Sequence, residues 1–284
     1  MPDTAQLHAD QVEFWNGVGG ARWVSNQKRT EGMISAVADL AIERAAIKAG
    51  ETVIDIGCGC GGTTVEFAKL VGPAGHVTGA DVSAPILAVA AERLAGFSNA
   101  ETVLADAAAY DFPPGAADLL FSRFGVMFFG DPPVAFANMK KALKPSGRVV
   151  FACWRPPNEN PWMVAPLEAT YKHVPPLPQL GPDDPGPFSF GKQERVTRIL
   201  TEAGFNTPTF ESVDLTFDLA GGQGLDAAVA CALELGSTAR ALDGQPPEVH
   251  DAVAVSMKEF LAQFSEGDSV KMQAGIWIVS TTPA

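Results

Sequence analysis

One stretch of ten residues, Val53–Gly62, constrains the fold of this chain more than any other. It reads Val-Ile-Asp-Ile-Gly-Cys-Gly-Cys-Gly-Gly, so an apolar segment ends in an acid and then in glycines. The apolar residues suit a strand buried on both faces, and the glycines permit a tight turn and close approach of the backbone to a ligand. The next residues, Thr63–Leu70, are predicted to form a helix whose free amides and positive dipole end face the loop. This order of strand, glycine loop and helix predicts a site of the nucleotide-binding type.

Two classes of cofactor fit this loop. Gly57, Gly59 and Gly62 satisfy the dinucleotide pattern G-x-G-x-x-G, and Asp81 follows at about the distance of a ribose-binding acid. Asp55 indicates a different cofactor, because a carboxylate at the end of the strand would repel a pyrophosphate and attract a cation.

The spacing Asp55-x-Gly57-x-Gly59-x-Gly61 resembles the first motif of the class I S-adenosylmethionine (SAM)-dependent methyltransferases. SAM carries an ammonium and a sulfonium group and no phosphate, so an acid beside the loop is compatible with it. The resemblance is firm over residues 49–154 and includes the turn Leu143–Arg148. It implies SAM as the cofactor and methyl transfer as the activity.

The same resemblance assigns roles to residues at the ends of the next predicted strands. Asp81 is expected to accept both ribose hydroxyls, because the alternative role of helix cap is already met by Ser83. Asp106 and the amide of Ala107 are expected to meet the amino group and a ring nitrogen of adenine, and Ser122 to lie near the methionine part of SAM. The predicted cofactor-binding set is Asp55, Gly57, Cys58, Gly59, Gly61, Asp81, Val82, Asp106, Ala107, Ser122 and Trp23.

Five strand–helix units in the first half of the chain predict a parallel, doubly wound α/β sheet. A sixth strand is expected at Pro208–Leu219 and a last one at Lys271–Ser280, which in the resembled fold runs antiparallel between the fifth and the sixth. The prediction is a Rossmann-like sheet of seven strands, mostly parallel with the last strand antiparallel, carrying helical cap insertions. Its expected parts are an N-terminal helical lid segment (1–48), the SAM-binding core (49–154), a cap insertion (155–190), a core helix and strand (191–220), a helical cap insertion (221–267) and the last core strand (268–284).

Three segments outside the core are candidates for covering the site. Phe14–Trp23 places aromatic residues beside glycines ahead of the first regular helix, predicted at Glu31–Ala49, and suits either a flap on the core or a mobile lid over the cofactor. The second segment holds ten prolines between positions 156 and 187, together with aromatic residues, and is interpreted as part of a substrate cover. The third is expected to form two amphipathic helices, Leu225–Ala241 and Pro247–Phe264, which pack on the cap or across a homodimer interface.

Methyl transfer from a sulfonium is an in-line displacement that depends on holding the two reactants in a dry pocket, so a general base is optional. His173 is the candidate base, although a lone histidine is more often structural or exposed. Cys58 and Cys60 lie within the loop, where their small side chains serve as packing, and no group of residues has metal-ligand spacing. The residues expected to contact the acceptor substrate are Trp15, Phe128, Trp154 and Trp162.

Composition limits the partners of this chain. Its 33 acidic and 20 basic residues give a formal charge of −13, which disfavours a nucleic-acid partner. No apolar run approaches membrane-spanning length, and the four cysteines form no disulfide pattern. A soluble, cytoplasmic protein with no membrane partner is therefore expected.

Three functions stay open at this point. The leading prediction is a SAM-dependent methyltransferase that modifies an oxygen, carbon or nitrogen atom of a small, largely apolar molecule. The alternatives are a SAM-binding enzyme of another reaction, such as a cyclisation or decarboxylation, and a non-catalytic binding subunit. Neither insertion carries a motif that identifies the acceptor.

Overall fold

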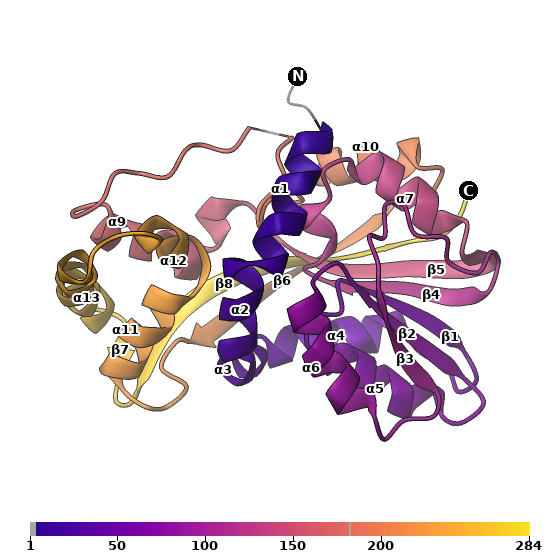
Figure 1. Ribbon diagram of the computed structural model, residues 1–284, viewed down its shortest axis with the longest axis horizontal. Helices are drawn as coiled ribbons and strands as arrows, with labels where there is room; N and C mark the ends of the chain where they lie inside the picture. Colours follow the sequence, from indigo (N-terminus) through magenta and orange to yellow (C-terminus); the bar gives the residue numbers. More distant parts are fainter. Residues whose placement is uncertain (1–3, 182) are drawn as a thin grey trace.

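The computed structural model describes residues 4–181 and 183–284. Its centre is a twisted sheet with the strand order β3-β2-β1-β4-β5-β8-β6, against which the helices pack (Figure 1). A two-residue strand, β7 (Ser265–Glu266), pairs only with the start of β8. The strands of the main sheet are β1 (Thr52–Ile56), β2 (His76–Asp81), β3 (Ala100–Leu104), β4 (Ala117–Arg123), β5 (Leu143–Trp154), β6 (Thr209–Asp218) and β8 (Ser269–Thr281).

The first five strands pair in parallel, and β8 runs antiparallel between β5 and β6. This confirms the predicted Rossmann-like sheet of seven strands, to which the short β7 is an addition. The chain winds from β1 outward to β3 and then crosses to β4 on the other side of β1. Open α/β sheets bind ligands at such a reversal, at the carboxyl ends of the strands. The fold thus places the candidate site where β1 and β4 end.

Five helices pack against the core of the sheet, and the apolar pattern of each explains its position. Helix α6 follows Ser83, has Pro85 in its first turn, and buries Ile86, Leu87, Ala90 and Leu94. Helix α5 buries Phe67, whose ring meets that of Phe121 on β4 edge-on at 4.7 Å. These helices are α4 (Ser35–Ala45), α5 (Gly62–Val71), α6 (Ala84–Leu94), α7 (Pro132–Lys140) and α10 (Gln193–Glu202).

The N-terminal segment is helical from its first described residue onward. It forms α1 (Thr4–Asn16), α2 (Val18–Ser25) and α3 (Gln27–Met33), which precede α4. The single helix expected over Glu31–Ala49 is in fact divided, because α3 ends at Met33 and α4 begins at Ser35. Helix α4 ends at Ala45, and its C-cap residue Ala46 has a left-handed conformation with φ of +47°.

The two insertions fold together into one cap at the left of Figure 1. The first contributes η2 (Pro157–Glu159), α8 (Pro161–Val164) and α9 (Pro166–Thr170); the second contributes α11 (Leu225–Glu234), α12 (Gly236–Leu242) and α13 (Pro247–Ala262). Helix α13 packs on both α9 and α11. The predicted helix over Leu225–Ala241 is in fact two helices, because Leu235 is extended and Gly236 has a positive φ of 61°. No helix in the described part of the chain is long and apolar enough to cross a membrane.

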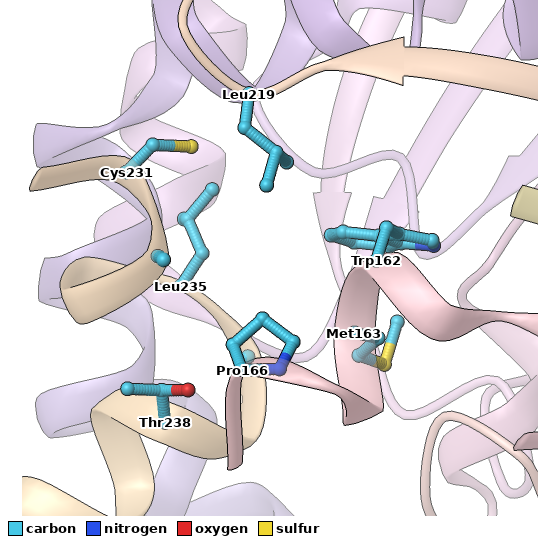
Figure 2. A pocket seen from close by; sticks show the side chains of 9 residues that line it. Trp162, Met163, Pro166, Leu219, Cys231, Leu235 and Thr238 are labelled. Carbon is cyan, nitrogen blue, oxygen red and sulfur yellow. The ribbon is translucent and has the colours of Figure 1, made fainter. Parts of the chain in front are cut away.

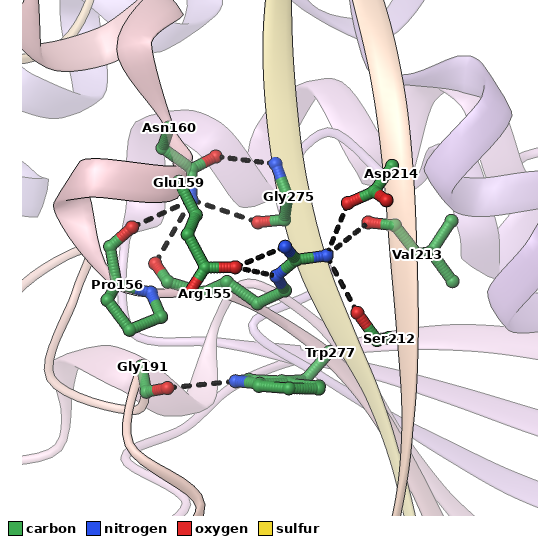
Figure 3. Close-up of polar contacts among 10 residues, drawn as sticks. All are labelled: Arg155, Pro156, Glu159, Asn160, Gly191, Ser212, Val213, Asp214, Gly275 and Trp277. Atoms are coloured by element: carbon green, nitrogen blue, oxygen red, sulfur yellow. Dashed lines mark hydrogen bonds and ion pairs between the residues drawn. The ribbon is translucent and has the colours of Figure 1, made fainter.

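Arg155 joins the cap to the sheet at the end of β5 (Figure 3). Its guanidinium pairs with Glu159 of η2, approaches Asp214 of β6 at 2.5 Å, and lies 5.5 Å from the ring centroid of Trp277 on β8. The neighbouring Asn160 is fully buried and exchanges two hydrogen bonds with the backbone of Gly275. The first insertion is thereby fixed to the antiparallel part of the sheet.

Candidate active site

Three acids lie at or directly beyond the carboxyl ends of neighbouring strands: Asp55 on β1, Asp81 on β2 and Asp106 after β3. Asp55 is fully buried, and its Oδ2 accepts hydrogen bonds of 2.7 Å from the hydroxyls of Thr63 and Thr64 in the first turn of α5. Its Oδ1 has no partner among the described residues. Burial raises the pKa of Asp55 to about 6, and the two hydroxyl donors oppose this rise. Asp55 thus fixes the start of α5 against the end of β1.

The loop after β1 can approach another backbone only because it lacks side chains. Gly57, Gly59 and Gly61 have positive φ angles of 62°, 59° and 76°. A Cβ on Gly57 would lie 2.8 Å from the Cα of Gly125, in the loop after β4. The loops that follow β1 and β4 therefore touch. Residues 57–62 are called the cradle below.

Asp81 shapes the same cradle from the end of β2. Its Oδ2 accepts a hydrogen bond from the amide of Gly59, and its Oδ1 accepts one from the amide of Ser83, both at 2.9 Å. Burial raises the pKa of Asp81, while these backbone donors oppose the rise. Ser83 occupies the N-cap position of α6 but caps no amide there; its hydroxyl donates to the carbonyl of Trp15 at 2.5 Å. Each carboxylate oxygen of Asp81 keeps a lone pair for a ribose hydroxyl.

Asp106 and Ala107 follow β3 at the same edge of the sheet. Oδ1 of Asp106 accepts the amide of Ala108 at 2.9 Å, and Oδ2 lies 3.1 Å from Nε2 of His8 on α1. Helix α1 thus reaches the residue that was expected to recognise adenine.

The N-terminal helices cover this edge of the sheet. Asn16 donates to the carbonyl of Val82 and accepts from the amide of Ala84, both at 3.0 Å. The ring of Trp15 meets that of Trp23 at 6.2 Å and that of Phe128 at 5.2 Å. The indole nitrogen of Trp23 lies 3.4 Å from where a Cβ on Gly59 would be. The N-terminal helices, called the lid below, thus lie against the glycine loop.

The end of β4 contains a strained residue and one that the sequence analysis left without a role. Ser122 is buried, and its hydroxyl accepts the amide of Gly125 at 3.2 Å. Phe124 has a positive φ of 67°, unusual for a residue with a side chain, and its ring stacks on Trp154 at 4.0 Å. Arg123 lies between them. The register of β1 and β4 could have drawn attention to it, because Arg123 shares a strand face with Phe121, which pairs with Asp55.

His173 lies away from the strand ends. It is exposed, and its Nε2 is 2.8 Å from the hydroxyl of Ser256 on α13. No contact among the described residues joins it to the glycine loop, so the structure does not place the candidate base at the site. The sequence alone could not show this, because the path of a proline-rich loop depends on what it packs against.

Trp154 and Trp162 do lie together, with ring centroids 5.3 Å apart, at the base of the cap. Trp162 also lines a cavity of about 20 Å³ between the two halves of the cap (Figure 2). Of the predicted acceptor contacts, Trp15 of α1 and Phe128 form one group, and Trp154 and Trp162 form another toward the cap.

These residues fit SAM. The loop after β1 carries glycines with positive φ, a buried acid with one oxygen unpaired among the described residues stands behind it, and two further acids line the edge along which ribose and adenine would lie. A reversed strand order with this set of residues defines the class I SAM-dependent methyltransferase fold.

Comparison with known proteins agrees. A family model described as a methyltransferase domain matches residues 53–147. The ubiquinone/menaquinone biosynthesis C-methyltransferase UbiE of Pseudomonas aeruginosa is 30% identical over 183 residues, which are 61% of this chain and 72% of that protein. The chain therefore belongs to the class I SAM-dependent methyltransferases, and SAM is its cofactor.

Solved structures show the same fold at low sequence identity. The YcgJ protein of Bacillus subtilis matches with a TM-score of 0.57 and 14% identity, over 87% of this chain and 97% of that one. The phosphoethanolamine N-methyltransferase 2 of Haemonchus contortus, solved with S-adenosylhomocysteine (SAH), matches with a TM-score of 0.53 and 20% identity; the match covers 88% of this chain and 53% of that one.

Proposed function

We propose that this enzyme transfers the methyl group of SAM to a small, uncharged and largely apolar molecule, at a carbon, oxygen or nitrogen atom. The observation that carries the proposal is a run of aromatic side chains from the end of β4 into the cap. Phe124 stacks on Trp154, Trp154 contacts Trp162, and both tryptophans meet the edge of Phe217 at 6.0 and 5.2 Å. The four rings are buried, so an acceptor that reached them on opening of the cap would meet mainly apolar surface.

The cavity beyond this run supports an uncharged acceptor. Figure 2 shows Trp162, Met163 and Pro166 facing Cys231 and Leu235 across it. No charged side chain of the described residues lines the cavity, so an ionised group there would lose its hydration without gaining a charged partner. Its volume of about 20 Å³ holds little more than one water molecule, so an acceptor enters only if the halves of the cap separate.

Methyl transfer requires little from the protein beyond holding SAM and the acceptor in the right positions. When bound, SAM supplies an activated methyl group on a sulfonium. The acceptor atom uses its electron pair to form the new bond while the sulfur keeps the electrons of the broken one, which leaves SAH, and the acceptor proton passes to water. Trp154, and Phe128 where it contacts Trp15 of the lid, would exclude bulk water and align the acceptor. The name of the UbiE relatives favours a carbon atom as the acceptor.

Mass spectrometry tests this proposal. The purified enzyme is incubated with SAM and a panel of phenols, hydroquinones and indoles, next to phosphorylated amines as charged acceptors. We expect an apolar acceptor to gain about 14 mass units, the replacement of H by CH₃, together with one equivalent of SAH. Modification of the charged amines alone would contradict the apolar assignment. Bound SAM with no methylated product would favour a SAM-binding enzyme of another reaction.

A pair of variants links turnover to the aromatic run. Trp162→Leu removes a ring from the aromatic run. Phe210→Leu removes a ring that instead packs on Trp277 of β8, with the ring centroids 5.9 Å apart. We expect Trp162→Leu to raise the KM for the acceptor and Phe210→Leu to leave it near the wild-type value. Equal effects in the two variants would place the acceptor elsewhere.

A further inference from the structure

Arg123 points toward the helix that follows the glycine loop. It lies two residues after Phe121, so both side chains leave β4 on the same face of the sheet. That face is covered by α5, because Phe121 packs against Phe67, and Asp55, next to Phe121 across the strand pair, accepts hydrogen bonds from α5. Since Arg123 ends the strand, its guanidinium lies beside the N-terminus of α5, at the glycine loop.

This guanidinium has no protein partner. Among the residues that the structure describes, the Arg123 side chain forms no ion pair and donates no hydrogen bond. The nearby Arg93 is different, because it contacts Glu31 and the carbonyl of Cys60, both at 2.7 Å. Burial lowers the pKa of Arg123, and attraction by Asp55 and Glu31 opposes that effect. Arg123 is partly buried, and a guanidinium without a direct partner in such a position can accept an anionic ligand at little cost in lost contacts.

The start of α5 favours an anion at the same place. Its N-cap residue is Gly61, and no side chain caps its first turn in the described part of the chain. Free amides and the positive end of the helix dipole therefore face the space that Arg123 borders. A carboxylate in that space would accept hydrogen bonds from both, and Arg matches the planar carboxylate with two parallel donors.

SAM has one anionic group, the α-carboxylate of its methionine part. We propose that Arg123 binds this carboxylate and so fixes the methionine end of the cofactor where the loops after β1 and β4 touch. The inference rests on SAM as the cofactor and adds a residue to it. Asp81 and Asp106 would hold the nucleoside end, and Arg123 the amino-acid end.

Ligand analogues test the proposal on the unaltered protein. Calorimetry compares SAH with S-adenosyl-3-thiopropylamine, which keeps the nucleoside, sulfur and ammonium but lacks the carboxylate. We expect SAH to bind at least about tenfold more tightly, which corresponds to about 1.4 kcal/mol. Equal affinities would overturn the proposal. Failure of SAH to bind at all would instead overturn the cofactor assignment, and the proposal with it.

Variants then assign the effect to one residue. Arg123→Met should weaken SAH binding about tenfold or more and leave binding of the thiopropylamine unchanged, while Arg123→Lys should recover part of the loss because it keeps the charge. Arg29→Met is the control, since Arg29 is more exposed and pairs with Glu234 on the surface. Equal weakening of both ligands in Arg123→Met would indicate a structural role and contradict the proposal. If Arg123→Met does not fold, the comparison of the two ligands on the wild type still decides.

Discussion

At the scale of single residues, two glycines near β1 show two different reasons why a position requires glycine. Gly50 and Gly57 both have positive φ angles, of 85° and 62°. A Cβ on Gly50 would meet nothing within 4 Å, whereas one on Gly57 would lie 2.8 Å from the Cα of Gly125. The first position therefore needs glycine for its conformation alone, and the second for the contact between two loops as well.

We expect Gly50→Ala to cost about 1 kcal/mol of unfolding free energy, and Gly57→Ala clearly more because backbone must also move. Binding of SAH should survive the first substitution and be lost in the second. Urea unfolding and calorimetry measure the two effects. Similar unfolding costs together with intact SAH binding in both variants would show that the contact between the loops after β1 and β4 is not needed.

Asp81 serves the protein and the expected ligand at once, since it accepts the amides of Gly59 and Ser83. Asp81→Ala should weaken SAH binding by about 1–3 kcal/mol, the usual cost of losing charge-assisted hydrogen bonds. Calorimetry measures this, and the exposed acid of β3, changed in Glu101→Ala, is the control. A folded Asp81→Ala protein with unchanged affinity would exclude the ribose role.

At the scale of elements, the sequence predicted the helices and strands whose positions depend on local residue patterns. The helix over Ala84–Leu94 and the strands of the core follow from apolar spacing and from nearby Ser, Pro and Gly residues. The bounds of α1 and α2 within the expected helical lid segment were not predicted, because Gly17, Gly19 and Gly20 look like helix breakers. In the structure Gly19 and Gly20 are buried, and added Cβ atoms would clash with the Phe14 ring and the Trp15 carbonyl. Tertiary packing thus overrides propensity there.

In the candidate site, too, some residues are determined by local sequence pattern and others by contacts between distant segments. Asp55, the loop glycines, Asp81 and Asp106 could be located from the sequence, because each belongs to a strand end in a regular order. The position of His173 beside Ser256 and the gathering of Trp154 and Trp162 under the cap could not, since both depend on contacts between distant segments. Arg123 was passed over because a single arginine carries no pattern; only its strand face and lack of a partner distinguish it.

The lid is an element whose attachment can be loosened selectively. Asn16 bridges α1 to the segment after β2 with two hydrogen bonds of 3.0 Å. Asn16→Ala should remove about 1–2 kcal/mol of lid docking and raise the dissociation rate of SAH about fivefold to thirtyfold. Stopped-flow measurement tests this, with Gln6→Ala on the same helix as control, because the recorded partner of Gln6 is Asp10 within α1. An unchanged rate would mean that the lid does not limit release.

At the scale of the whole molecule, segments distant in sequence meet at one edge of the sheet. The lid comes from the start of the chain, the cap from two insertions, and the site from the loops between them (Figure 1). The cap contributes apolar side chains to this edge of the sheet, and the core contributes buried acids next to them. The global stability of the protein should therefore depend on the ionisation of its most buried acid.

Asp55 connects that ionisation to folding. Its pKa rises from 3.8 to about 6 on folding because burial disfavours the carboxylate, with Arg123 and Asp81 as nearby charges of opposite sign. Between pH 3.8 and about 6 the folded state then binds more protons than the unfolded state. The stabilising effect of protonating Asp55 is therefore complete below pH 3.8. It is lost as the pH rises through about 6. Lowering the pH from 7 to 5 should stabilise the wild type by about 1 kcal/mol relative to Asp55→Asn, in which the group does not titrate.

Urea unfolding of both proteins at the two pH values measures this difference, because contributions from all other titrating groups cancel to first order in the comparison. Asp118→Asn provides a control with no expected change, since hydrogen bonds from Lys144 and the amide of Thr52 hold the pKa of Asp118 below its ordinary value of 3.8 and the group stays ionised between pH 5 and 7 in both states. A constant difference between wild type and Asp55→Asn would mean that Asp55 keeps an ordinary pKa in the folded protein. The unpaired Oδ1 would then have to be solvated within the cofactor cradle, and the dry environment proposed for methyl transfer would not extend to the end of β1.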